Sequence, residues 1–145
     1  MGGIFGTKAS LISDLNLILQ IIILFVLLVS VTFKKRGNFK MHGSLMGLAV
    51  VLNAISFFLV MGPSFAGSAG FIQREFSSVG VLTVLAHALT GALAEILGIW
   101  VVGEWLLHSM ETKACVKRKK VMRGIVSLWF VAIILGIAVY VIYYL

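Results

Sequence analysis

Four long apolar stretches take up most of this chain of 145 residues. They cover about residues 11–33, 42–62, 79–107 and 121–145, and only short polar links separate them. An α-helix crosses the core of a bilayer in about 20 apolar residues, and only helices or closed barrels satisfy their backbone groups in lipid. The pattern therefore predicts an all-α fold, a four-transmembrane-helix bundle that forms a single membrane domain.

The composition leaves no room for a soluble domain. Hydrophobic residues make up 61% of the chain and charged residues 12%, and the mean hydropathy is +1.12. These values lie outside the range of soluble globular proteins. Function is therefore expected inside the membrane or at its edges.

Basic residues gather in two of the three links. Ten of the twelve lie in the first and third links, namely Lys34, Lys35, Arg36, Lys40, Lys113, Lys117, Arg118, Lys119, Lys120 and Arg123. An even number of crossings puts these links on one side, which the positive-inside rule makes cytoplasmic. We expect an up-down-up-down topology in the cell membrane with both termini outside, and basic links that contact lipid headgroups rather than nucleic acid.

Several kinds of chemistry find no support in the sequence. Cys115 is the only cysteine, so an internal disulfide is excluded. The HExxH zinc motif, the nucleophile elbow and the phosphate loop are also absent from the sequence. No hydrolase is indicated, and an enzyme is the less favoured interpretation.

A few polar residues lie within or at the ends of the apolar stretches, where each needs a partner or a role. They are His42, Asn53, His87, Glu95, Glu104, His108 and Arg123. At 1.5 Å per residue, four of these fall near the cytoplasmic edge, where they are expected to form one cluster: His42, Glu104, His108 and Arg123.

Asn53 and Glu95 both fall near the middle of the membrane. The short link between their helices makes these helices antiparallel neighbours. A carboxyl group at that depth is expected to be neutral or hydrogen-bonded. An interhelical hydrogen bond to Asn53 and a role in proton handling are both open for Glu95.

His87 lies about 12 Å inside the outer end of its helix. Gly91, Ala94 and Gly98 follow it on the same helical stripe, so His87 is expected to face protein rather than lipid. The small residues indicate either tight helix packing or room for a flat cofactor beside a histidine.

Two imidazoles on different membrane helices are a common way to hold haem b. His42 and His108 share the cytoplasmic edge, where Arg123 could bind the haem propionates. His87 could instead be the single axial ligand, or could take Met61 as the opposite ligand. Methionine together with histidine also suits Cu(I), which leaves copper as an alternative.

Three segments resemble a known family. They are KKRGNFKMHGSLMGLAVVLNAISFFLV, LTVLAHALTGALAEILGI and RKKVMRGIVSLWFVAIILGIAVYVIYYL, and they are similar to domain-of-unknown-function family 420, the YozB or CtaM-like four-helix membrane proteins. The resemblance implies a role in the maturation of haem-copper oxidases. It places His42 and His87 where the family has histidines that are candidate haem or metal ligands, whereas Arg118 stands where the family tends to have a further histidine.

Three functions follow from these observations. The first is a haem-binding or respiratory-complex assembly factor that acts with an oxidase or another redox complex. The second is an electron-transfer protein like a b-type cytochrome, linked to quinol. The third is a structural subunit without a cofactor. The oligomeric state is left open.

The topology can be tested with protease sites inserted between Lys35 and Lys40 and between Lys113 and Lys120. Both should be cleaved only from the cytoplasmic side, because the basic residues retain these links there. Protease protection in right-side-out and inverted vesicles is the measurement. Cleavage of either site from outside would contradict the topology.

Overall fold

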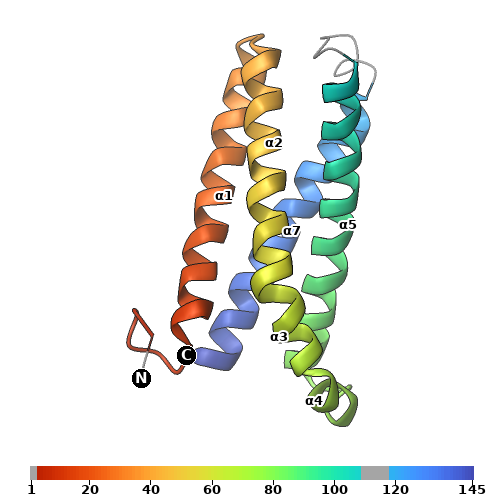
Figure 1. Ribbon diagram of the computed structural model, residues 1–145. Coiled ribbons are helices and arrows are strands. Elements are labelled where there is room, and N and C mark those ends of the chain that lie inside the picture. The colour runs from red at the N-terminus through yellow and green to blue at the C-terminus, as the bar shows by residue number, and fades with distance from the viewer. Residues whose placement is uncertain (1–2, 109–117) are drawn as a thin grey trace.

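The computed structural model describes residues 3–108 and 118–145, and every element in it is a helix (Figure 1). The elements are α1 (Leu11–Lys35), α2 (Phe39–Ser56), the π-helix η1 (Phe57–Met61), α3 (Gly62–Gly67), α4 (Ala69–Arg74), α5 (Val79–Leu107) and α7 (Lys119–Tyr144). The helices α2, η1 and α3 follow one another without a break. With α1, α5 and α7 they give four helices that are long and apolar enough to span a membrane, which confirms the predicted all-α, multi-pass membrane fold.

Side-chain caps fix where three of the long helices begin. Ser10, Asn38 and Ser78 each accept a hydrogen bond from the backbone N–H three residues further along. The Asn38 cap makes α2 begin at Phe39. The predicted start at residue 42 was too late, because the first turn of α2 is partly polar. Gly37, with φ of +76°, lets the chain turn between α1 and α2.

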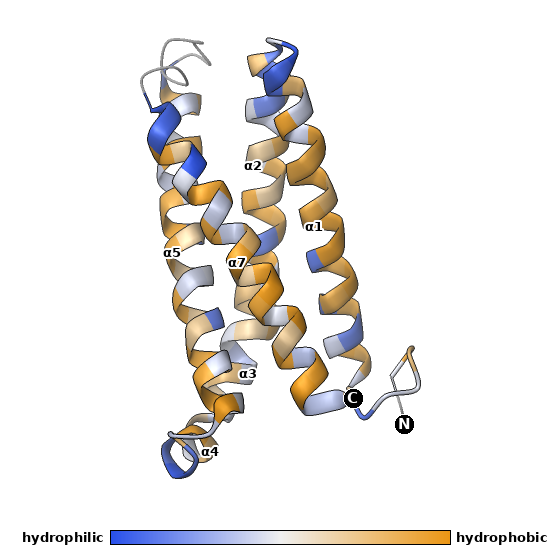
Figure 2. Ribbon diagram, turned by 180° about the vertical axis from the view of Figure 1, so that it is seen from behind, coloured by the Kyte–Doolittle hydropathy of each residue, from blue (hydrophilic) through white to orange (hydrophobic). Residues whose placement is uncertain are grey.

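The two ends of the bundle differ in chemistry. We call the end that carries residues 34–40, 104–108 and 118–123 the basic end, and Figure 2 shows its hydrophilic colour above apolar helices. Part of the third link, including Lys113, Lys117 and Cys115, lies outside the described residues.

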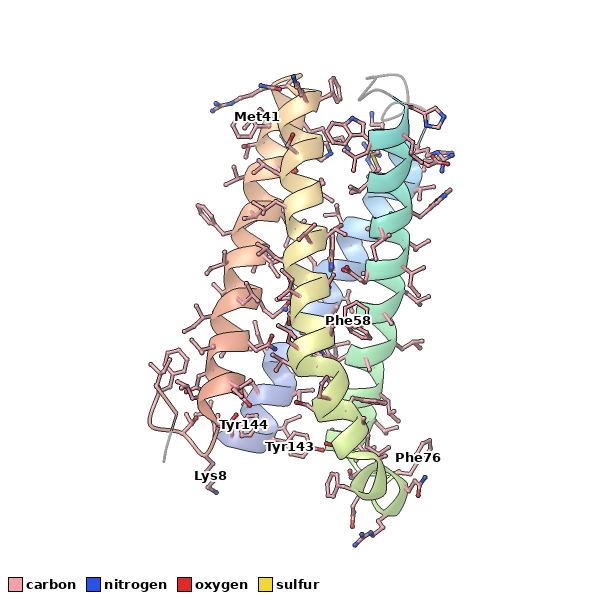
Figure 3. All side chains as sticks on the ribbon, viewed as in Figure 1. Lys8, Met41, Phe58, Phe76, Tyr143 and Tyr144 are labelled. Atoms are coloured by element: carbon pink, nitrogen blue, oxygen red, sulfur yellow. The ribbon has the colours of Figure 1, made fainter. Side chains whose placement is uncertain are left out.

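We call the opposite end the tyrosine end; it carries residues 5–14, α3, α4 and residues 140–145. There the backbone N–H of Lys8 donates to the carbonyl of Tyr144 at 3.3 Å. Figure 3 shows Lys8, Tyr143 and Tyr144 at this end, whereas Met41 lies at the basic end.

Helices α2 and α5 run side by side in a fixed antiparallel register. Gly43 lies so close to the Trp105 ring that a Cβ atom there would overlap it, and a Cβ at Gly98 would lie 3.2 Å from Val50. These contacts confirm that small residues are used for close helix approach. Three residues further toward the tyrosine end on both helices, the same register pairs Asn53 with Glu95.

The half of the bundle toward the basic end is filled with side chains. The buried core consists of Ile23, Leu27, Ala49, Val50, Ala94, Val101, Ile125, Trp129 and Ile133. Many other large apolar side chains are exposed on the outside of the bundle, for example Phe58, which is 72% exposed. In a membrane protein this surface contacts lipid tails, because they are as apolar as the side chains.

The π-helix η1 lies directly before Pro63. Proline has no N–H, and its ring clashes with the carbonyl of the residue four positions earlier, here Leu59. The backbone responds by widening the turn, so that the N–H of Gly62 donates to the carbonyl of Phe57, five residues back. A widened turn changes which side chains face inward, and Phe57, Val60 and Met61 of η1 all line an internal cavity.

The register is tested by adding a methyl group at Gly43. The substitution Gly43→Ala should lower the free energy of unfolding by about 1–3 kcal/mol, because the new Cβ atom overlaps Trp105. Thermal or denaturant unfolding of the protein in detergent measures the change. The matched control is Gly103→Ala on α5, where no atom lies within 4 Å of the added Cβ. Equal stability of the two variants would contradict this helix contact.

Candidate functional site

A cavity of about 590 Å³ lies among α1, α2, η1, α3, α4, α5 and α7 in the half of the bundle toward the tyrosine end. Its volume falls in the range of small-molecule and cofactor sites, and its wall is mostly apolar. The polar side chains in the wall are those of Ser13, Asn16, Gln20, Asn53, Ser64, Ser68, His87, Tyr140, Tyr143 and Tyr144. The cavity therefore combines an apolar volume with a few convergent polar groups.

His87 on α5 is half-buried and lines this cavity. Its Nδ1 lies 2.8 Å from the carbonyl oxygen of Ala132 on α7. Because a carbonyl can only accept, Nδ1 carries the proton, and in the neutral imidazole Nε2 then keeps its lone pair. The ring lies against Gly136, where a Cβ atom would come within 2.9 Å of the imidazole. The prediction that His87 faces protein is confirmed.

Met61, the last residue of η1, lines the same cavity. It lies eight residues beyond Asn53 on α2 and η1, and His87 lies eight residues before Glu95 on the antiparallel α5. In a regular α-helix, a residue eight positions on lies off the stripe of Asn53. The wider π turn shifts Met61 back toward that stripe. The structure thus places the two residues considered as an alternative ligand pair in the lining of one cavity.

Asn53 and Glu95 form the predicted interhelical hydrogen bond. The Asn53 Nδ2 donates to Glu95 Oε2 at 2.8 Å, and both side chains are buried. Asn53 also accepts a hydrogen bond from Gln20 Nε2 of α1 at 3.3 Å. Neither Gln20 nor Asn16 was singled out from the sequence, although Ser13, Asn16 and Gln20 have the three- and four-residue spacing of one helical face.

A buried carboxylate at the tyrosine end was also missed. Asp14 is fully buried, and its Oδ1 accepts from the Tyr140 hydroxyl at 2.5 Å. Its Oδ2 accepts from the backbone N–H of Phe5 at 3.2 Å, and Thr7 Oγ1 lies 3.1 Å from the Tyr140 hydroxyl. These bonds join α1, α7 and the segment before α1 beside the cavity.

His42 is buried at the basic end, away from the cavity. Its Nδ1 lies 2.7 Å from Ser30 Oγ, and Ser30 Oγ also donates to the His42 carbonyl at 3.1 Å. The next residue, Gly43, contacts Trp105, which is 18 residues and about 27 Å along α5 from His87. The structure therefore does not bring His42 and His87 together, because α2 and α5 are antiparallel and the two histidines lie near opposite ends.

The expected cluster of four polar residues at the cytoplasmic edge is not formed. Glu104 pairs with Arg118 at 2.5 Å, and the Arg118 guanidinium lies 4.3 Å from the centre of the Trp100 ring. His108 is exposed and its Nδ1 bonds the carbonyl of Glu104 at 2.8 Å, which ends α5. Arg123 is exposed on the first turn of α7.

The expected haem ligands differ in whether they line a cavity. His42, His108 and Arg123 line neither this cavity nor the shallower apolar groove between α2 and α5. The described residues include no group of three or more histidine, cysteine or acidic side chains that could hold a metal ion, and the copper alternative, which rests on methionine with histidine, stays a prediction. His87 is the one predicted histidine ligand that faces a cavity of cofactor size.

Comparison with known proteins adds nothing to this geometry. No family model, no curated protein and no solved structure matches the chain. The resemblance to the family described above therefore stays a prediction, and the functional argument has to be made from the residues around the cavity.

The Asp14–Tyr140 contact can be tested by removing the hydroxyl group. The substitution Tyr140→Phe should lower the free energy of unfolding by about 1–3 kcal/mol, because it takes a hydrogen bond from a buried carboxylate. The control is Tyr143→Phe on the same helix turn, which should change the stability by less than about 0.5 kcal/mol. Unfolding in detergent measures both, and equal losses would argue against the contact.

Proposed function

We propose that this protein is an integral membrane haem-binding protein, with haem b held in the cavity of the tyrosine end and His87 as its axial ligand. The observation that carries the proposal is the geometry of His87. Its Nδ1 is bonded to the Ala132 carbonyl, so the Nε2 lone pair is available in a cavity that its imidazole lines. Iron-ligating histidines are commonly oriented by such a hydrogen bond on the other ring nitrogen.

Met61 is proposed as the ligand on the opposite side. A thioether and an imidazole form a known haem ligand set, and both residues line the cavity. This pair replaces the His42–His87 pair favoured by the family resemblance and the His42–His108 pair at the basic end.

The remaining residues around the cavity have separate tasks in this proposal. Gly136 leaves space for the His87 ring, and the mostly apolar wall would contact the porphyrin. The hydroxyl groups of Tyr143, Tyr144, Ser64 and Ser68 provide polar surface for the propionates in place of Arg123. Haem bound here would supply one-electron redox chemistry at its iron.

The cellular role in the proposal rests on the sequence. The family resemblance favours an assembly factor that carries haem for a haem-copper oxidase or another respiratory complex. The proposed orientation is up-down-up-down in the cell membrane, with the basic end in the cytoplasm in contact with anionic lipid and both termini outside.

Quinol-linked electron transfer is the second candidate. It is favoured by Asn16, Gln20 and Asn53 in the cavity wall, because amide groups can hydrogen-bond the oxygens of a quinol head. Turnover of a quinol analogue by the haem-loaded protein would favour this role over carriage of haem for assembly.

The haem proposal is tested by visible spectra of the purified protein, oxidised and reduced with dithionite. The wild type should show a low-spin b-type spectrum. His87→Gly should lose it, and added imidazole should restore it by taking the place of the missing ring. Met61→Leu should keep the haem but convert it to a five-coordinate, high-spin form.

The control variants are His42→Ala and His108→Ala, which change histidines outside the cavity and should keep the wild-type spectrum. Loss of the spectrum in His42→Ala, with the protein still folded by circular dichroism, would contradict the ligand assignment. If the wild type binds no haem after expression with excess haem precursor, the haem proposal fails. The interpretation as a structural subunit without a cofactor then remains.

A further inference from the structure

Helix α1 carries a polar face that enters the membrane from the tyrosine end. Ser13, Asn16 and Gln20 lie on this face, and all three line the cavity. Polar side chains inside a membrane helix cost free energy unless they have partners or contact water. Ser13 Oγ donates to the Tyr144 hydroxyl at 3.5 Å at the outer edge of this face, and Gln20 lies about 10 Å further in.

Hydrogen bonds connect this face to Glu95 in the middle of the membrane. The Ser56 hydroxyl donates to Asn16 Oδ1, and Gln20 Nε2 donates to Ser56 Oγ at 3.1 Å. The same Gln20 amide donates to Asn53, which in turn donates to Glu95 Oε2. Five side chains from α1, α2 and α5 therefore form one continuous network.

The network leaves one atom of Glu95 without a partner. Glu95 is 7% exposed, and its Oε1 is fully buried and makes no hydrogen bond among the described residues. A buried oxygen of this kind requires a proton, a water molecule or a cation.

No basic side chain of the described residues lies at the depth of Glu95. Asn53 of α2 bonds Glu95 and Gln20 of α1 bonds Asn53, while Trp129 of α7 lies against Gly98, one turn from Glu95 on α5. On α5 itself the nearest titratable groups are His87, two turns toward the tyrosine end, and Glu104, which is paired with Arg118. Asp14, further toward the tyrosine end, is bonded to Tyr140.

Access to Glu95 differs between the two ends of the bundle. Toward the tyrosine end, the polar face of α1 borders the cavity, and water in such a cavity can bridge groups that do not touch. Toward the basic end, the bundle has a core of buried apolar residues, among them Val50, Val101 and Ile125. Trp105 closes the α2–α5 contact beyond them.

We propose that Glu95 is a proton-binding site in the middle of the membrane, and that protons reach it only from the tyrosine end through the polar wall of the cavity. The Asn16–Ser56–Gln20–Asn53 network holds the Glu95 carboxyl group in place and lines the route. The proposal does not depend on haem, so it can fail or succeed independently of the function proposed above.

A membrane-soluble carbodiimide tests the site, because it reacts with protonated carboxyl groups. The carboxyl proton moves to a carbodiimide nitrogen, and the carboxyl oxygen bonds to the central carbon of the carbodiimide. The resulting O-acylisourea then rearranges to a stable N-acylurea, and no group leaves. Full-length protein is placed in vesicles of phosphatidylcholine, and its orientation is determined by protease protection. Mass spectrometry then measures the adduct on Glu95.

Glu95 labelling should follow the pH on the tyrosine side alone. Once the group is mostly ionised, labelling should fall about tenfold for each unit that this pH rises, while a change on the basic side should have no effect. The variant Glu95→Gln should lose the adduct. The double variant Asn16→Leu and Gln20→Leu should weaken the response to tyrosine-side pH, whereas the lipid-facing control Ser127→Leu should keep it.

Labelling that follows the basic-side pH, or the pH on neither side, would overturn the proposal. If Glu95 is never labelled, infrared spectra of the wild type and Glu95→Gln decide the question. The proposal requires a carboxylic acid C=O band that depends on pH and is missing from Glu95→Gln, and the absence of such a band would also overturn it.

Discussion

The antiparallel contact between α2 and α5 sets the relative depth of Asn53, Glu95 and the histidines on these two helices. Lipid tails are as apolar as the side chains, so membrane helices associate through close packing and hydrogen bonds rather than through the hydrophobic effect. Gly43 against Trp105 and Gly98 against Val50 supply the close packing, and Asn53 with Glu95 supplies the hydrogen bond. If α2 slid along α5, Asn53 and Glu95 would separate, and different residues of the two helices would lie at the same depth.

The half of the bundle toward the basic end has a packed apolar core, whereas the half toward the tyrosine end contains the cavity. Toward the basic end, apolar side chains from all four long helices meet in the core. Toward the tyrosine end, the π-helix before Pro63 interrupts α-helical geometry, and Gly91 and Gly136 provide little side-chain volume. The cavity with His87 lies in this second half, while the Asp14–Tyr140 contact joins α1 to α7 beside it.

The sequence predicted those features that depend on spacing within one helix or between neighbouring helices. The four apolar stretches, the Asn53–Glu95 pair and the inward face of His87 all follow from the 3.6-residue period and from the short link between α2 and α5. The Asp14–Tyr140 contact could not be predicted in this way, because α1 and α7 are distant in sequence and their pairing depends on how the bundle closes. The position of Met61 also depends on the π turn, since a regular helix would direct it elsewhere. The spacing of Ser13, Asn16 and Gln20 on one helical face is the sequence signal for the polar wall of the cavity.

We propose that haem binds in the cavity at the tyrosine end and not at the basic end. The anomalous X-ray scattering of iron in crystals of the haem-loaded protein tests it most directly, because it locates the metal without reference to the protein side chains. The account predicts a single iron peak beside Nε2 of His87, on the side that faces Met61. An iron peak beside His42 or His108 at the basic end would contradict it.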